Sequence, residues 1–235
     1  MLKIGPHARF LPGYVHGLHQ PCLALPIRVT KAPSAEQLAA SERRLSQALG
    51  SAAAQSAAPS QPTQQAPLDP EPYLLDWLAR QLQALQVTAG FGWLPRPITL
   101  STAPGQSPWP WLLLVPTVAP AWRQTLAVVR SLCRCIDPTS FGDAAPGEEA
   151  TLAAAQAVAS AVADLGRATP GGANVPNLLR HAASMDIPVL HISGSCFQFG
   201  QGARSQWLDS TFTESTSRLS AQMARDKAQG GLLLR

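Results

Sequence analysis

The chain has 235 residues, of which 46% are hydrophobic and 14% are charged, and its formal net charge is +4. This length suits one larger domain or two small ones with a sizeable core, and a diffuse charge without a Lys/Arg block argues against nucleic-acid binding. The chain starts without the apolar run of a signal peptide, and no stretch approaches the roughly 20 apolar residues that span a bilayer. We therefore expect a cytoplasmic protein whose partners are neither nucleic acid nor membrane.

Residues 1–49 predict short strands followed by a helix. Residues 22–29 form the best strand, in which Pro26 favours an edge position or a bulge because proline cannot donate to a neighbouring strand. Ser34 and Gln37 have the spacing of a capping box and predict a helix that ends near Leu49. Residues 50–69 are rich in Ala, Ser, Gln and Pro, so we expect a flexible linker or surface loop there.

Residues 70–169 predict a larger α+β domain. Apolar residues recur at helical spacing over 70–86, and strands are expected at 98–101 and 111–117. Two further helices follow, at about 121–136 and 148–165. After the boundary at Gly171-Gly172, residues 170–235 predict a smaller α/β unit with a helix at 177–184, strands at 189–193, 197–199 and 204–208, and a last helix at 213–234. The expected fold class is therefore α/β.

Single motifs predict little chemistry. Gly200-Gln201-Gly202 lacks the third glycine of a nucleotide-binding loop and indicates a turn. The hydroxyl-rich residues 210–217 suit either a phosphate contact or a helix N-cap, and the N-cap suffices. His16 and His19 have no carboxylate or cysteine beside them, and the four cysteines show no zinc spacing, so buried free thiols are expected. We predict no catalytic residue and no metal site.

The stretch 177–235 nevertheless resembles the segment of cyanophycin synthetases that leads into their ATP-grasp fold. The family pattern is a helix, G-I-P, a strand, Q-x-G-x-G, T-x-x-T-S, and a helix with D-K and a Leu pair. The corresponding residues here, in order, are Asp186-Ile187-Pro188, Gln198-Phe199-Gly200-Gln201-Gly202, Thr213-Glu214-Ser215-Thr216-Ser217, Asp226-Lys227 and Leu233-Leu234. Looser similarities precede it, in the 78–92 and 127–136 stretches.

This resemblance implies an N-terminal domain followed by a pre-ATP-grasp subdomain of a peptide-bond-forming ligase. The complete enzyme would phosphorylate a carboxylate with ATP and Mg²⁺, and an amine would attack the acyl phosphate. Lys227, in the D-K pair, would then contact ATP, and Asn174 would stand where the family approaches its amino-acid or peptide substrate. One departure concerns residues 73–77, where Tyr-Leu-Leu-Asp-Trp replaces the H-x-x-E-H that some members carry, so no zinc-dependent side activity is expected.

The family's ATP-grasp domain has no counterpart within these 235 residues. We expect the chain to be inactive alone, to be the N-terminal portion of such a ligase, and to supply one wall of the ATP site together with surfaces for substrate or homo-oligomer contact. The alternative is a stand-alone, non-catalytic interaction protein, or a subunit that pairs with a separate ATP-grasp chain.

Overall fold

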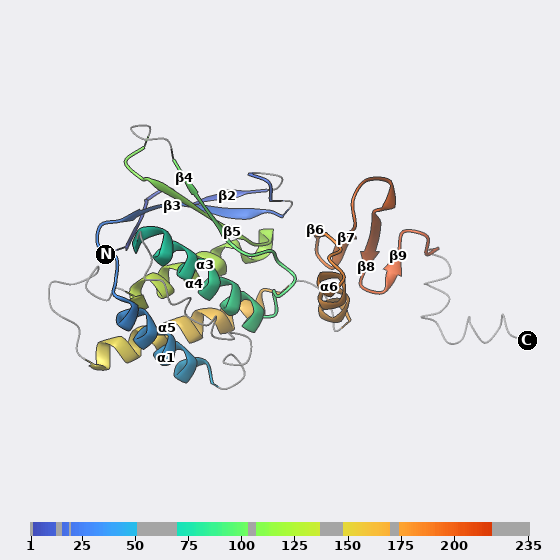
Figure 1. Ribbon diagram of the computed structural model, residues 1–235. Coiled ribbons are helices and arrows are strands. Elements are labelled where there is room, and N and C mark those ends of the chain that lie inside the picture. The colour runs from blue at the N-terminus through green and yellow to red at the C-terminus, as the bar shows by residue number, and fades with distance from the viewer. Residues whose placement is uncertain are drawn as a thin grey trace, which may run out of the picture. The chain divides into compact units, whose positions relative to one another are not determined.

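The computed structural model describes residues 2–12, 16–18, 20–50, 70–102, 107–136, 148–169 and 174–217. The chain divides into two compact units, Met1–Thr169 and Pro170–Arg235, which we call unit 1 and unit 2 (Figure 1). Helices and antiparallel sheets occur in both, so the protein belongs to the mixed α/β class. No helix among the described residues is long and apolar enough to cross a membrane. The predicted linker at 50–69 lies, after Gly50, outside the described residues.

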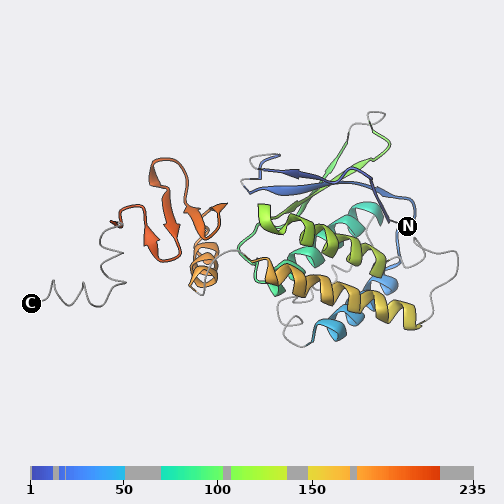
Figure 2. The ribbon, with the colours of Figure 1, turned by 180° about the vertical axis from the view of Figure 1, so that it is seen from behind.

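Unit 1 is built on an antiparallel sheet whose described helices all lie on one side (Figures 1 and 2). Its strand order is β1-β3-β5-β4, and β2 also pairs with β3. The strands are β1 (Leu2–Ile4), β2 (Arg9–Leu11), β3 (Cys22–Val29), β4 (Ile98–Ser101) and β5 (Trp111–Pro116). On the helical side, Leu23, Leu25 and Ile27 of β3 are completely buried. Alternate residues of each strand point to opposite faces, so this row fixes the sheet's inner face.

The predicted edge position of β3 is wrong, because β3 lies in the middle of the sheet with Pro26 inside it. The carbonyl of Pro26 accepts from the N–H of Gly5 at 2.7 Å, on the side of β1 and β2. A strand residue directs its N and its C=O to the same neighbour. The missing N–H of Pro26 therefore faces the gap between the end of β1 at Ile4 and the start of β2 at Arg9, and the ladder with β5 loses no bond.

The helices of unit 1 form a layer beneath the sheet. They are α1 (Ala35–Leu49), α3 (Pro70–Thr88), the 3-10 turn η1 (Ala119–Ala121), α4 (Trp122–Ile136) and α5 (Glu148–Arg167). The predicted capping box is confirmed: Ser34 Oγ accepts from the Gln37 N–H at 3.2 Å, and Gln37 Oε1 accepts from the Ser34 N–H at 2.8 Å. Because α5 packs against α4 and α1, and β3 pairs with β5, the segments 1–49 and 70–169 share one core.

Unit 2 consists of one helix and a four-stranded antiparallel sheet in chain order, within its described residues. Its elements are α6 (Val175–Ser184), β6 (Val189–Ser193), β7 (Cys196–Phe199), the 3-10 turn η3 (Gly202–Arg204), β8 (Gln206–Asp209) and β9 (Phe212–Thr213). The helix predicted from Thr213 is wrong at its start, because Phe212 and Thr213 pair with Asp209 and Leu208 of β8. Residues 218–235 lie outside the described residues.

Candidate functional site

Of the two residues assigned to a site by the sequence, only Asn174 lies in the described part of the chain. Asn174 is the N-cap of α6, is exposed, and makes no side-chain capping hydrogen bond, although its carbonyl accepts from the Leu178 N–H at 3.2 Å. A helix N-terminus favours negative charge. The Asn174 side chain therefore lies at a helix end whose dipole favours an anion. Lys227 lies outside the described residues.

The Gly200-Gln201-Gly202 segment forms the tight connection between β7 and β8. Both glycines have positive φ, 76° at Gly200 and 59° at Gly202, which is the conformation that glycine adopts at least cost. A Cβ on Gly200 would come within 3.1 Å of the Arg204 carbonyl oxygen. The predicted turn is therefore confirmed, and its glycines are explained by backbone geometry without a nucleotide.

Gln198, the first residue of the Q-x-G-x-G match, holds this turn in place. Its Nε2 donates to the Gly200 carbonyl at 3.2 Å, and its Oε1 accepts from Trp207 Nε1 at 3.2 Å. The Trp207 side chain is nevertheless 49% exposed, and Ile192 is 40% exposed. The sequence did not predict that Trp207 is exposed, because no local signal distinguishes an exposed tryptophan from a core tryptophan.

Thr213, at the end of β9, and Thr216, in the turn that follows, bond to one another. Thr213 N–H donates to Thr216 Oγ1 at 3.1 Å, Thr216 N–H donates to the Thr213 carbonyl at 2.9 Å, and the two Oγ1 atoms are 3.2 Å apart. Each hydroxyl thus has a local partner in this turn. These hydroxyls therefore bond within a local turn.

In the described residues of unit 2, the hydroxyl of Ser195 is not paired with the imidazole of His191. His191 is 9% exposed, lies 5.0 Å from the Phe197 ring, and places Nε2 3.0 Å from the Gly194 carbonyl. Ser195 Oγ donates to Asp209 Oδ1, so the serine and the histidine have separate partners. These contacts stabilise the β6–β7 turn and do not form a triad, whose base must contact its nucleophile.

The stretch that replaces H-x-x-E-H lies at the start of α3 and serves packing. Trp77 is 2% exposed, and its Nε1 donates to Glu42 Oε1 on α1 at 2.7 Å. Asp76 pairs with Arg80 Nε at 3.0 Å and with Arg96 Nη2 at 2.5 Å. Across the described residues, no group of three or more His, Cys, Asp or Glu residues is arranged to hold a metal ion.

The thiols of unit 1 are buried and unbonded. Burial raises the pKa of Cys133 to about 12, and it also raises the pKa of Cys22. Burial likewise raises the pKa of Cys135, although the charge of Arg44 partly opposes the shift. A thiol that stays protonated is a poor nucleophile, so these three cysteines are core residues, as the sequence predicted. The prediction is wrong for Cys196 of unit 2, which is only half-buried.

Comparison with known proteins identifies no family. No family model matches the chain, and no curated protein matches it. The functional reading therefore depends on the motif resemblance and on the geometry described above.

Proposed function

We propose that this chain is the N-terminal and pre-ATP-grasp portion of an ATP-dependent carboxylate–amine ligase of the cyanophycin synthetase type. The observation that carries the proposal is the order and spacing of the matched motifs within the single compact unit 2. Asp186-Ile187-Pro188 joins α6 to β6, and Gln198–Gly202 spans the end of β7 and the turn into β8. In this proposal the chain binds and orients, and a separate or continuing ATP-grasp domain supplies the rest of the nucleotide site.

Two residues would act on the reactants. Asn174, at the N-terminus of α6, would hydrogen-bond the carboxylate of an amino-acid or peptide substrate. Lys227 would contact ATP phosphate oxygens as a point charge. Mg²⁺ and ATP would activate the carboxylate as an acyl phosphate when the complete site is assembled.

Calorimetry with Mg²⁺-ATP tests this proposal. The chain alone should bind ATP with a Kd of about 1 mM or weaker, corresponding to ~4 kcal/mol, and should release no phosphate. After fusion to, or mixing with, an ATP-grasp chain, phosphate release should depend on an added amino acid or peptide. In that assembly Lys227→Ala should weaken ATP binding about tenfold or more, whereas Lys31→Ala, a lysine of unit 1, should not.

Two results would contradict the proposal. One is magnesium-dependent phosphate release by the chain alone, above a heat-inactivated control. The other is an unchanged ATP affinity in Lys227→Ala together with a melting temperature lower by several degrees, which would make Lys227 a structural residue. Failure of every ATP-grasp partner to restore activity would favour the stand-alone interaction protein.

A further inference from the structure

The sheet of unit 1 has a second, outer face that carries no helix among the described elements (Figures 1 and 2). The pairing register defines it: Arg9, Ala24, Leu114 and Ile98 stand opposite one another across β2, β3, β5 and β4. Leu11, Ile98, Leu100 and Leu112 are only partly buried there, against a floor that includes Ala24 and Leu114. The half of the outer face over β5 and β4 is therefore apolar and partly open.

The other half of the outer face is cationic. The five strands of unit 1 contain Lys3, Arg9 and Arg28 and no acidic residue. Arg9 pairs with Ala24, and Lys3 pairs with Arg28. Because Ala24 lies on the outer face and Arg28 is four residues further along β3, all three cations point outward. Lys3 and Arg9 lie on β1 and β2 and Arg28 lies on the neighbouring β3, and the register positions of the three cations span about 13 Å at ~3.3 Å per residue.

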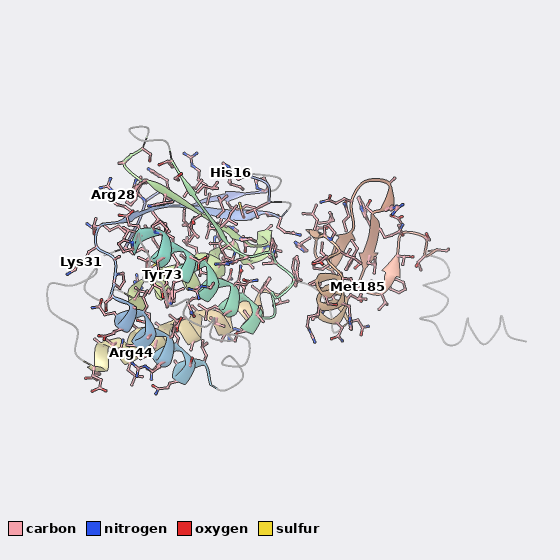
Figure 3. The ribbon with its side chains drawn as sticks, in the orientation of Figure 1. His16, Arg28, Lys31, Arg44, Tyr73 and Met185 are labelled. Carbon is pink, nitrogen blue, oxygen red and sulfur yellow. The ribbon has the colours of Figure 1, made fainter. Side chains whose placement is uncertain are left out.

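Arg28 is held in this position by its neighbours. Its Nη2 donates to the Pro108 carbonyl, and its guanidinium lies 5.4 Å from the centre of the Trp109 ring. In Figure 3, Arg28 and His16 lie on the side away from the helices, whereas Tyr73 and Arg44 lie on the helical side. A guanidinium fixed against an aromatic ring loses little conformational freedom when it meets an anion.

We propose that the outer face of unit 1 is a docking site for an amphipathic helix of a partner protein whose charged residues are Asp and Glu. The helix would lay its apolar stripe on Leu100 and Leu112 and direct its carboxylates toward Lys3, Arg9 and Arg28. A span of about 13 Å corresponds to about nine residues of α-helix, so carboxylates two to three turns apart on one flank would match the cations.

The charge of the outer face and the exposure of its apolar side chains argue against other binding partners. A second copy of the chain would oppose cations to cations, which is unfavourable across an interface. A lipid surface needs apolar side chains that project into it, yet the large apolar side chains of this face are partly buried and none of the described ones is fully exposed. Nucleic acid would satisfy the cations but would leave Leu100 and Leu112 uncovered.

The test measures binding of a fluorescein-labelled synthetic helix to the full chain by fluorescence anisotropy. The probe has about 18 residues, with Leu on one stripe, Glu on its flank and Ala or Gln elsewhere. The double variant Lys3→Glu/Arg9→Glu changes two exposed cations of the outer face. Arg43→Glu/Arg130→Glu, in exposed positions on α1 and α4, makes the same change of net charge elsewhere and serves as the matched control.

We expect the outer-face variant to bind the probe at least tenfold more weakly and the control variant to change binding less than twofold. A probe with Ser in place of Leu should also bind at least tenfold more weakly. The proposal is overturned by absence of binding to the wild-type chain, by equal losses in both double variants, or by equal binding of the Ser probe. Concentration-dependent dimerisation that Lys3→Glu/Arg9→Glu abolishes, or tighter binding of anionic vesicles or RNA, would also overturn it.

Discussion

The contact between α1 and α3 depends on one carboxylate, and its removal should measurably destabilise unit 1. Glu42 Oε1 accepts from Trp77 Nε1 at 2.7 Å and from Gln81 Nε2 at 2.8 Å. Trp77 is 2% exposed, so Glu42→Ala would leave its N–H without a partner in the core. A hydrogen bond to a charged group contributes about 1.5–3 kcal/mol. We therefore expect the free energy of unfolding to fall by about 2 kcal/mol. The loss comes from the Trp77 hydrogen bond, because Gln81 is less buried and can donate to water instead.

At 2–4 °C per kcal/mol for a domain of this size, the melting temperature should fall by about 4–8 °C. A thermal melt followed by circular dichroism measures the shift, and Glu36→Ala on the same helix is the control, with a loss of about 0.3–1 kcal/mol from the helix dipole. A double-mutant cycle with Trp77→Phe isolates the pair. Strictly additive single losses would refute the reasoning, since they would mean that the hydrogen bond contributes nothing beyond the separate side chains.

Two further predictions concern the turn of unit 2 and the buried thiols. Gly200→Ala should destabilise unit 2 by at least ~1–2 kcal/mol in urea unfolding, because φ is positive and the new Cβ lies 3.1 Å from the Arg204 carbonyl. Gly202→Ala should cost less, as nothing lies within 4 Å of its Cβ; equal losses would contradict this account. At pH 8, iodoacetamide should label half-buried Cys196 first and leave Cys133 unlabelled until the chain unfolds, because burial raises the pKa of Cys133 to about 12. Equal labelling rates in the native protein would argue against that burial.

Local rules predicted most of the elements of unit 1. Ser34 and Gln37 specify the start of α1 through bonds only three residues apart, and the helical spacing of Leu78 and Leu82 specifies α3. The same local rules could not predict which other elements those helices pack against. The hydrogen bond from Trp77 to Glu42 joins residues 35 apart, with the polar stretch 50–69 between them.

The two errors have the same physical origin. Pro26 suggested an edge strand because the sequence alone shows that proline has no N–H to donate. It does not show that the neighbouring strand is interrupted opposite Pro26, which depends on where β1 ends and β2 begins. Thr213 suggested a helix start because a hydroxyl and a following helical pattern are local signals. Its pairing with Leu208 across the β8–β9 turn takes precedence. In each case a contact between strands overrode a single-residue preference.

The candidate site was only partly accessible to sequence reasoning. Asn174 could be placed by its motif, and the structure adds that its side chain is exposed at a helix N-terminus without a capping bond. The cationic edge of unit 1 could not be found, because Lys3, Arg9 and Arg28 are scattered along the chain and become neighbours only through the register of β1 and β2 with β3.

The polar chemistry of unit 1 also bears on what this unit contributes. Where some members of the resembled family carry a metal-hydrolase pattern, Trp77 is in the core and Asp76 pairs with Arg80 and Arg96. A carboxylate held between two guanidinium groups on the surface has its charge already compensated, and a buried indole offers neither a base nor a metal ligand. On the opposite side of the sheet, the cations of the outer face have no strand carboxylate to pair with. In the function proposed above, unit 1 would therefore contribute a binding surface, and the ligase chemistry would depend on unit 2 and the domain that would complete it.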